Sequence, residues 1–594
     1  MTTKTQQSDP IKSQTTMETK EKEKTRKKIP PYGTEITGSE ALIFSLIEEG
    51  VDTIFGYPGG AIMPVYDALF DYLHHLQHIL VRHEQGAAHA AESYAKILGK
   101  PGVVMVTSGP GATNLITGLA NAMIDSVPIV AFSGQVPSNL LGTDAFQETD
   151  VMGITMPVTK WNYQVTSAEE LPEVVAKAFY IASTGRPGPV MIDITKDAQF
   201  GKMKWNYKKC TKIRSYFPYP KVDEEKVEEA AHLINKSKKP LLIAGQGVLI
   251  SNATDELMQL ATKADIPVTT TLLGLSSFPS DHPLHVGMPG MHGNMAPNIK
   301  TNECDLLIAI GMRFDDRITG KLDEYAPQAR IIHIEIDQSE IDKNVKTDVA
   351  IVADARDALR KLLPMVKEND HKEWIESFEK EYEHEYHHVI KPAREAKGDD
   401  IKMDEVVHMI SEKTGGEAIV VTDVGQHQMV AARNYSFKRA RSFVTSGGLG
   451  TMGFGLPASV GATVARPDRT VVAFTGDGGF QMTIQELGTI AHYRLPVKMV
   501  LLNNSFLGMV RQWQDLFFDK RYSFTELVNP EFTKIAEGYG IPGRRIEKRE
   551  ELEEAIDTML STDGPYLLEV AVMKEQNVFP MVPAGASVSN MVTK

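Results

Sequence analysis

Short apolar runs alternate with amphipathic stretches from about residue 33 onward, which predicts parallel strands joined by crossover helices. The first helix illustrates the pattern. Thr37 and Glu40 form a capping box, apolar side chains recur between Leu42 and Ile47, and Gly50 ends the helix. The predicted strands form three groups: 53–56, 79–82, 103–107, 129–133 and 190–194; 241–244, 267–271, 306–310 and 331–336; and 419–422, 471–475, 497–502 and 566–570.

Each group has the size of one doubly wound domain, so the predicted fold class is α/β, with three consecutive domains on parallel sheets. The total of 594 residues agrees with several domains. The stretch 201–222 is rich in Lys and aromatic residues, and the stretch 367–402 is charged and rich in His, so both are predicted linkers. The expected division is a disordered tail 1–32, linker 201–222, linker 367–402, and domains 33–200, 223–366 and 403–594.

Charge and cysteine content narrow the possible partners and location. The formal net charge of -14 argues against nucleic acid or an anionic membrane as the main partner, because both usually bind Lys-rich and Arg-rich surfaces. The two cysteines lie far apart with no metal-binding spacing, which favours a reducing cytoplasm. No apolar run approaches the roughly 20 residues that span a bilayer. The polar N-terminal stretch is unlike a secretory signal, and its composition predicts disorder.

Two strand ends in the last group carry metal-binding and phosphate-binding chemistry. The strand 471–475 runs into Gly476, Asp477, Gly478 and Gly479, and the strand 497–502 is followed by an Asn-Asn pair that ends at Asn504. Neighbouring strand ends would bring the Asp and Asn oxygens to one ion, and such ligands suit Mg²⁺ shared with a diphosphate. The glycines let the backbone approach phosphate, and the following helix N-terminus points N–H groups at it.

This combination resembles the signature of the thiamin-diphosphate enzymes. The resemblance implies that the main-chain carbonyl of Phe506 completes the Mg²⁺ site, although many members have a polar residue there. It also assigns two upstream stretches to the cofactor. Residues implied to cradle the diphosphate or hold the aminopyrimidine are Val424, Gly425, Gln426, His427, Gly450 and Met452. Without its neighbours, Met452 would be interpreted as a core residue.

A third stretch supplies the candidate catalytic acid. Glu84 follows an apolar strand and enters a helix of small residues, within the run RHEQGAAHAA. A glutamate at this position is most often a charge that favours the helix N-terminus. The run resembles the motif of thiamin-diphosphate enzymes in which a glutamic acid hydrogen-bonds the pyrimidine ring and promotes loss of the C2 proton. The resemblance therefore makes Glu84 catalytic and cofactor-binding, in a different domain from the metal motif.

Further runs narrow the resemblance to the acetohydroxyacid (acetolactate) synthase catalytic subunits, from about residue 33 to the end of the chain. They include GYPGGA from Gly56, TDAFQE from Thr143 and RFDDR, which is typical of the FAD-containing biosynthetic members. In that family the central domain binds FAD, which does no net redox work. Residues implied for FAD are Arg186, Gly245, Gly247, Thr271, Leu272, Met291, His292, Gly311, Arg313, Asp315, Glu335, Ile336, Asp354 and Ala355. By position alone, Glu335 at a strand end suits a ribose hydroxyl.

Substrate-binding residues follow from the same resemblance. Arg317 would bind the carboxylate of the second substrate, and Trp513 would border the pocket for its alkyl group. Gln147 would be a second catalytic residue in the access channel. The other residues implied to contact substrate are Phe146, Lys196 and Met509. Without the resemblance, Arg317 would be interpreted as part of a surface ion pair and Trp513 as a core aromatic.

The resemblance implies an enzyme of valine, leucine and isoleucine biosynthesis that joins two 2-oxoacids. It would decarboxylate pyruvate and condense the hydroxyethyl carbanion with pyruvate, giving 2-acetolactate, or with 2-oxobutyrate, giving 2-aceto-2-hydroxybutyrate. The implied cofactors are thiamin diphosphate, Mg²⁺ and FAD. The implied partners are a second copy of the chain, in a homodimer or homotetramer with active sites between chains, and a small regulatory subunit.

Other functions remain as alternatives. A pyruvate oxidase would form peroxide from oxygen, and a catabolic acetolactate synthase would contain no flavin. Glyoxylate carboligase is disfavoured because it lacks the catalytic glutamate that Glu84 supplies. A catalytically inactive scaffold is disfavoured because Glu84, Asp477 and Asn504 are all present.

Overall fold

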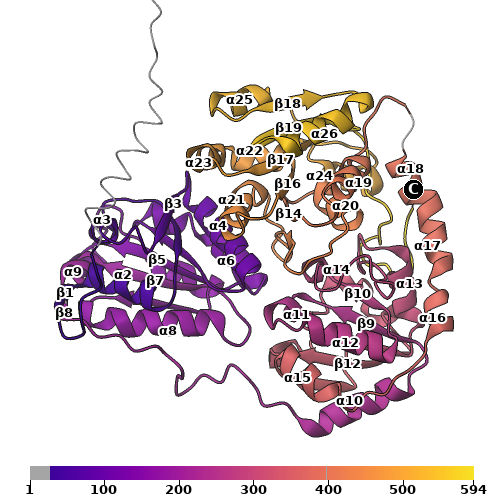
Figure 1. Cartoon of the computed structure of the whole chain (residues 1–594), viewed down its shortest axis with the longest axis horizontal. Helices are drawn as coiled ribbons and strands as arrows, with labels where there is room; N and C mark the ends of the chain where they lie inside the picture. Colours follow the sequence, from indigo (N-terminus) through magenta and orange to yellow (C-terminus); the bar gives the residue numbers. More distant parts are fainter. Residues whose placement is uncertain (1–26, 396–397, 594) are drawn as a thin grey trace, which may run out of the picture.

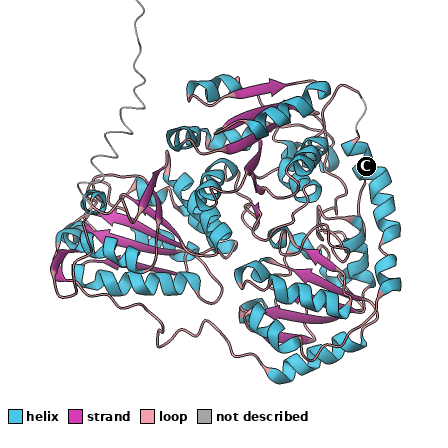
Figure 2. Ribbon diagram, viewed as in Figure 1, coloured by secondary structure: helices cyan, strands magenta, loops and turns pink. Residues whose placement is uncertain are grey.

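The computed structural model describes residues 27–395 and 398–593, so most of the predicted tail lies outside the described residues. Three α/β domains follow one another along the chain, each built on its own parallel sheet (Figure 1). Helices flank the sheets (Figure 2). The predicted fold class of three consecutive doubly wound domains is therefore confirmed.

The first domain has a six-stranded sheet with the order β3-β2-β4-β5-β7-β6. Its strands are β2 Thr53–Gly56, β3 Gln77–Leu80, β4 Gly102–Val106, β5 Ile129–Gln135, β6 Trp161–Val165 and β7 Val190–Thr195. Its helices are α2 Gly38–Glu48, α3 Met63–Phe70, α4 Glu84–Leu98, α5 Pro110–Thr113, α6 Ile116–Ile124, α7 Val151–Thr155, α8 Leu171–Ser183 and α9 Lys196–Phe200. The predicted capping box is present: the Glu40 backbone N–H donates to Thr37 Oγ1, and the Thr37 backbone N–H donates to the Glu40 carboxylate.

The central domain has a five-stranded sheet with the order β10-β9-β11-β12-β13. Its strands are β9 Pro240–Ala244, β10 Val268–Thr270, β11 Leu306–Ile310, β12 Arg330–Glu335 and β13 Val349–Val352. Its helices are α10 Glu224–Lys236, α11 Gln246–Ile250, α12 Thr254–Ala264, α13 Met295–Glu303, α14 Asp316–Thr319 and α15 Ala355–Leu362.

The third domain has a six-stranded sheet with the order β15-β14-β16-β17-β19-β18. Its strands are β14 Ile419–Thr422, β15 Phe443–Val444, β16 Val471–Gly476, β17 Val497–Asn503, β18 Gly543–Ile546 and β19 Tyr566–Ala571. Its helices are α19 Met403–Lys413, α20 Gln426–Asn434, α21 Gly455–Ala465, α22 Asp477–Met482, α23 Leu487–Tyr493, α24 Gly508–Phe517, α25 Phe532–Gly538 and α26 Leu552–Ser561.

All three sheets share one topological feature that positions binding sites. In each, the second strand of the domain pairs on one side of the first strand, and the third strand pairs on the other side. The chain therefore leaves the first and third strands in opposite directions and opens a crevice beyond their carboxyl ends, where α/β proteins bind ligands. The crevices lie beyond β2 and β4, beyond β9 and β11, and beyond β14 and β16.

Four strands of the three large sheets were missing from the sequence-based expectation: β6, β13, β15 and β18. Each lies at the edge of its sheet. Polar residues interrupt β6 and β18, which are mostly only partly buried or exposed, and β15 has only two residues. Strand β13 is a short apolar run, Val349–Val352, that the prediction overlooked. Apolar patterning therefore detects central parallel strands more readily than edges.

Segments between the domains contact the domains directly. Strand β8 Lys202–Lys204 pairs antiparallel with β1 Glu35–Thr37, and the fully buried Trp205 packs in the core of the first domain. After the central domain, α16 Lys372–Glu376 and α17 Glu379–Glu385 begin a helical stretch in which Trp374 packs in a core of the central domain. The chain end returns to the same core through Val588.

The first and third domains pack together through helices α4 and α21 (Figure 1). One continuous hydrophobic cluster includes residues of both domains. Among the described residues, no helix combines the length and apolar character needed to cross a membrane.

Candidate active site

A cavity of about 730 Å³ lies where the three domains meet, within the size range of sites that enclose cofactors. It lies beyond the carboxyl ends of strands of the central and third sheets, at their crevices. The first domain contributes a few residues near the end of α6 and around Arg186. The cavity is lined by all of the proposed site residues except Glu84, Phe146, Gln147, Lys196 and Gly245.

The proposed metal ligands come from two adjacent strand ends. Strands β16 and β17 are paired, with Gly476 opposite Leu502, so Asp477 and Asn504 follow neighbouring strands. Asp477 is the first residue of α22 and is buried; burial raises the pKa of its carboxyl to about 6. One carboxylate oxygen accepts a 2.6 Å hydrogen bond from Asn529. The side chains present a carboxylate and an amide oxygen, as hard divalent cations require.

Backbone turns beside these ligands leave room for a close-approaching anion. Gly425 precedes α20 with φ 153°, a conformation that favours glycine. A Cβ added at Gly476 would lie 2.8 Å from the His427 ring, and one at Gly478 would lie 2.7 Å from Leu507. His427 is buried, its Nε2 has no hydrogen-bond partner in the described part of the chain, and burial lowers its pKa to about 4. In the tautomer that carries its proton on Nε2, this imidazole can donate to a diphosphate oxygen, and the glycine-rich helix starts offer backbone N–H groups to the same anion.

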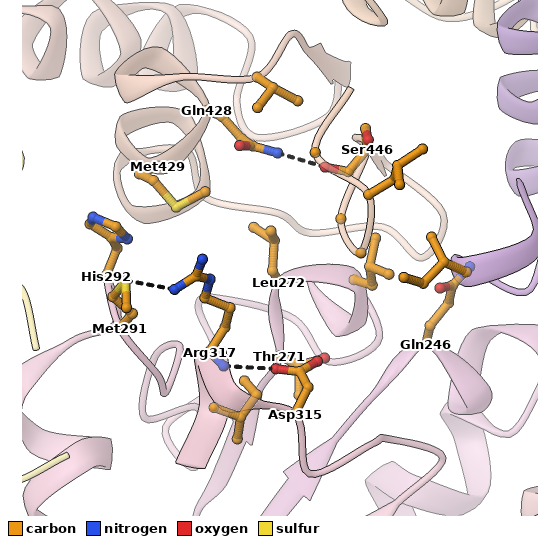
Figure 3. Close-up of a pocket in the computed structure, with 18 of the residues that line it drawn as sticks. Gln246, Thr271, Leu272, Met291, His292, Asp315, Arg317, Gln428, Met429 and Ser446 are labelled. Atoms are coloured by element: carbon orange, nitrogen blue, oxygen red, sulfur yellow. Dashed lines mark hydrogen bonds between the residues drawn. The ribbon is translucent and has the colours of Figure 1, made fainter. Parts of the chain in front are cut away.

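The 446–450 loop forms another wall of the cavity. Gln428 donates a 2.9 Å hydrogen bond from its amide to the Ser446 carbonyl (Figure 3). Gly450 has φ 70°, and the side chain of Met452 faces the same cavity. The proposed pyrimidine-binding residues are therefore brought beside the proposed diphosphate-binding turns.

The central domain contributes the other end of the cavity. Gly247 and Gly311 pack against each other across the crevice between β9 and β11: the Gly247 N–H donates to the Gly311 carbonyl at 2.9 Å. A Cβ on Gly247 would lie 2.5 Å from the Gly311 Cα, so both positions require glycine. Gly245 lies beneath this contact. Its Cβ would lie 2.2 Å from the Gly311 carbonyl oxygen, which explains why it supports the turn without lining the cavity.

Acidic residues lie at the strand ends of this region. Glu335 ends β12, and burial raises its pKa to about 7. Asp354 caps the N-terminus of α15, accepting from the N–H groups of Arg356 and Asp357. Arg186 reaches over from the first domain and donates to Asp337 and Glu340, both at 3.0 Å. These groups suit ribose hydroxyls and phosphate, which is the chemistry expected for a dinucleotide.

The proposed carboxylate-binding arginine faces the opening of the cavity. Arg317 follows Asp315, whose carboxylate accepts from its backbone N–H at 3.1 Å (Figure 3). Its guanidinium lies 3.6 Å from the Met291 sulfur and 3.6 Å from Asp316, and its side chain is 64% exposed. His292 lies beside it; burial lowers the pKa of His292 to about 4, so its ring is neutral. Arg317 therefore retains donors for an anionic substrate.

Helix α24 provides the hydrophobic side of the site. It follows the metal-binding turn directly, because β17 ends at Asn503 and α24 begins at Gly508. Met509 and Trp513 are one turn apart and both line the cavity. Trp513 packs against Phe517 with ring centroids 5.0 Å apart, so its indole is supported from behind.

Glu84 and its proposed companions form a separate group on the first domain. Glu84 begins α4 and accepts a 2.9 Å hydrogen bond from the Asn114 amide. Gln147, with φ 60°, packs its backbone on the turn at Gly109, and Phe146 is 88% exposed. Lys196 follows β7 at the carboxyl end of the same sheet. None of these residues lines the cavity, so one chain does not bring the proposed catalytic acid to the proposed metal site.

Two polar residues that organise the site were not predicted from the sequence. Asp423 follows β14 and is fully buried; its carboxylate accepts from the N–H groups of Val424, Gly453 and Gly455. It thereby ties the turn after β14 to the segment after Gly450. Its position directly after a strand and two residues before Gly425 was a usable signal. Asn529, which donates to Asp477, lies in a loop without any pattern in the sequence.

Comparisons with known proteins agree with this geometry. Three family profiles match in order: the N-terminal thiamine pyrophosphate binding domain over residues 36–154, the thiamine pyrophosphate enzyme central domain over 227–362, and the C-terminal thiamine pyrophosphate binding domain over 423–570. The chain therefore belongs to the thiamine pyrophosphate enzymes and carries both binding domains for that cofactor.

Individual relatives narrow the family. The chain is 47% identical to the acetolactate synthase isozyme 2 large subunit of Escherichia coli, over 94% of this chain and 100% of that protein. It is 47% identical to the probable acetolactate synthase large subunit of Methanocaldococcus jannaschii (93% and 95% covered) and 45% identical to the acetolactate synthase large subunit of Lactococcus lactis (94% and 96%). It belongs to the acetolactate synthase large subunits, and the expected family is confirmed.

Proposed function

We propose that the chain decarboxylates pyruvate and condenses the two-carbon product with a second 2-oxoacid, as an acetolactate synthase of branched-chain amino acid biosynthesis. Pyruvate as acceptor would give 2-acetolactate, and 2-oxobutyrate would give 2-aceto-2-hydroxybutyrate. The observation that carries the proposal is one cavity in which Asp477 and Asn504 lie with the glycine turns, the 446–450 loop and Arg317. When bound, thiamin diphosphate supplies the electron sink for decarboxylation.

The residues of the third domain would hold the cofactor. Asp477, Asn504 and the Phe506 carbonyl would bind Mg²⁺. The starts of α20 at Gln426 and of α22 at Asp477 would face the diphosphate, as would the His427 Nε2, which has no hydrogen-bond partner within the described residues. Glu84, oriented by Asn114, would hydrogen-bond the pyrimidine ring. Because Glu84 lies outside the cavity of its own chain, it would serve the site of a second copy.

The central domain would hold FAD at the β9/β11 crevice. Gly247 and Gly311 allow close approach, Glu335 and Asp354 suit hydroxyl groups, and Arg186 suits a phosphate. The buried His292 Nε2 has no partner within the described residues and is free to bind a polar atom of the ligand. Flavin in the purified protein would support the biosynthetic class of synthase, and a flavin-free active enzyme would support the catabolic alternative.

Arg317 and α24 would select the acceptor. The guanidinium would pair with the carboxylate common to both 2-oxoacids, and Trp513 would contact the alkyl group that distinguishes them. Partners proposed beyond a second copy of the chain are a small regulatory subunit, and dimer and tetramer both fit. The cytoplasm remains the proposed location, because both cysteines are unpaired and Cys304 is a buried thiol.

The decisive test of the function is an assay of acetolactate formation from pyruvate with Mg²⁺ and thiamin diphosphate. The metal assignment is tested separately with the variant Asp477→Ala. The variant should lose affinity for Mg²⁺ and for thiamin diphosphate together, because the ion would bridge protein and cofactor. The loss should exceed the ~10–100-fold contributed by partners that only orient a metal ligand. Titration calorimetry measures both constants. Unchanged binding of thiamin diphosphate by Asp477→Ala would contradict the metal assignment, and an enzyme inactive on pyruvate would contradict the function.

A further inference from the structure

A buried ionic network connects the first domain to the 446–450 loop of the third domain. Lys96, near the end of α4, forms an ion pair with Glu92 at 2.8 Å and donates hydrogen bonds to Asp125 at 2.9 Å and to the Thr445 carbonyl at 2.7 Å. The side chains of Glu92 and Asp125 are completely buried, and that of Lys96 is 8% exposed. Burial alone would lower the pKa of Lys96, but Asp125 and Glu92 outweigh this effect and the pKa is raised. The ammonium group therefore remains charged inside the protein.

Asp125 uses both carboxylate oxygens on the loop itself. Oδ1 accepts from the Gly448 N–H at 2.7 Å, and Oδ2 accepts from the Gly447 N–H at 3.0 Å. Both glycines are enclosed: a Cβ at Gly448 would lie 2.8 Å from Ile124, and one at Gly447 would lie 2.6 Å from Leu273. The loop is thus fixed by hydrogen bonds to a buried carboxylate and by close packing against the first and central domains.

Asn121 provides a second attachment from the same helix, α6. Its side-chain oxygen accepts from Ser446 Oγ at 2.5 Å and from Thr451 Oγ1 at 3.0 Å, and its amide donates to Glu92 at 2.7 Å. The Thr451 N–H in turn donates to Ser446 Oγ at 2.8 Å. Both ends of the 446–450 loop are therefore attached to the polar network of the first domain.

We propose that Asp125, held by Lys96, is a positioning residue that sets the 446–450 loop for the pyrimidine ring of thiamin diphosphate. This inference rests on the proposed function, because the loop carries Gly450, one of the residues that the family resemblance assigns to the cofactor. A buried ion pair can stabilise a fold without touching this loop, whereas both carboxylate oxygens of Asp125 accept hydrogen bonds from consecutive loop amides. Asp125 does not line the cavity itself. The first domain therefore acts on the cofactor-binding site of its own chain through the position of the loop.

The test compares Asp125→Asn with Arg441→Met. The asparagine keeps the size of the side chain but replaces one acceptor with a donor, so one loop N–H loses its partner. We expect weaker thiamin diphosphate binding by about 10–100-fold, the usual effect of losing a hydrogen bond to a charged group. C2 hydrogen exchange of bound cofactor should slow in parallel, a readout that a structural role alone would not change.

Arg441→Met is the matched control. Arg441 also joins the domains, donating to the Lys96 carbonyl at 2.8 Å and to Asn252 at 3.0 Å. Its hydrogen bonds among the described residues do not include the 446–450 loop. It should lower the melting temperature while thiamin diphosphate binding stays within about twofold of wild type. If both variants lost thiamin diphosphate affinity equally, Asp125 would have only a structural role and the proposal would be overturned.

An independent measurement needs no variant. In the cofactor-free protein the Gly447 and Gly448 amides should exchange slowly with deuterium, because both donate to a buried carboxylate. Exchange at the rate of an exposed loop would overturn the proposal even if Asp125→Asn does not fold. If wild type binds thiamin diphosphate and Asp125→Asn binds it equally well, only this inference fails. If wild type itself does not bind the cofactor, the proposed function fails.

Discussion

At the residue scale, three carboxylates acquire different roles from their surroundings. Glu84 is partly buried and accepts from Asn114, so one oxygen remains available for a ligand. Asp477 is buried beside Asn529 and faces a cavity, an environment that favours a bound cation. Glu335 is buried with its oxygen on the backbone N–H groups that follow it, and burial raises its pKa to about 7. Residue type alone would not separate these three.

For Glu84, the variant Glu84→Gln should bind thiamin diphosphate nearly as well as wild type but deprotonate C2 far more slowly. The amide has the size of the acid and keeps a contact to Asn114, but it cannot stabilise the required proton position. Positioned acid–base groups contribute about 10²–10⁴-fold. Hydrogen–deuterium exchange at C2, followed by NMR, is the measurement. A rate equal to wild type would rule out the catalytic assignment.

For Trp513, the variant Trp513→Leu should lose preference for 2-oxobutyrate while it continues to form acetolactate. The two acceptors differ by one methylene, which a hydrophobic wall discriminates by about 10–200-fold. Arg317→Ala serves as the contrasting variant, because both acceptors share the carboxylate and both products should fall. Competition between the two oxoacids, with both products resolved, provides the ratio. A wild-type ratio in Trp513→Leu would show that the indole does not border the acceptor.

At the element scale, the relation between the first and third domains depends on the crossing of α4 and α21. Helix α21 presents Gly461 to the backbone of α4, where an added Cβ would lie 1.9 Å from the Ala90 carbonyl oxygen. Close approach of two helices requires such a residue, because main-chain atoms cannot move aside as a side chain can. Helix α4 also carries Glu84 at its start and Lys96 near its end, so its placement affects both.

The corresponding prediction compares Gly461→Ala with Gly538→Ala. Replacing a helical glycine with alanine normally stabilises a helix by about 0.5–1 kcal/mol. Gly538, at the exposed end of α25, should follow that rule, because no described residue outside the helix backbone lies within 4 Å of an added Cβ. Gly461→Ala should instead be destabilised by about 1–3 kcal/mol from overpacking. Melting temperatures provide the comparison, and a Gly461→Ala protein at least as stable as wild type would show that the helices can separate without cost.

At the scale of the whole molecule, the proposed catalytic residues of one chain fall into two separate groups. The group around Asp477 lines the large cavity, whereas Glu84 and Gln147 lie on the first domain outside it. A complete site then needs the first domain of a second chain. Large exposed hydrophobic side chains on the first domain, including Phe146 at 88% exposure, agree with a surface that is covered in an assembly.

Subunit complementation tests this arrangement. Glu84→Gln and Asp477→Ala should each be nearly inactive alone. After the two proteins are mixed and allowed to exchange subunits, each mixed dimer would contain one site with both residues intact. Statistical exchange then restores about a quarter of wild-type activity in a two-fold dimer. Gel filtration and mass spectrometry would verify that mixed dimers form. If they form without any gain in activity, Glu84 and Asp477 belong to the same chain's site.

Local signals in the sequence were sufficient for the central strands, the capping box at Thr37 and the two strand ends at Asp477 and Asn504. These signals are short-range, because apolar runs mark buried parallel strands and polar residues after them mark the carboxyl edge of a sheet. The edge strands β6 and β18 were missed because polar residues interrupt the apolar run on which the prediction depends, whereas the edge strands β3 and β10 were predicted.

Tertiary structure alone decided which strand ends meet and which residues remain apart. The order of the strands placed Asp477 next to Asn504, and the packing of the domain brought Asn529 to Asp477 and Asn503. Arg186 of another domain lines the same cavity. It also separated Glu84 from that cavity and attached Asp125 to the 446–450 loop. Such relations join residues that are far apart along the chain, and they follow from the packing of whole domains, which no local pattern of apolar and polar positions encodes.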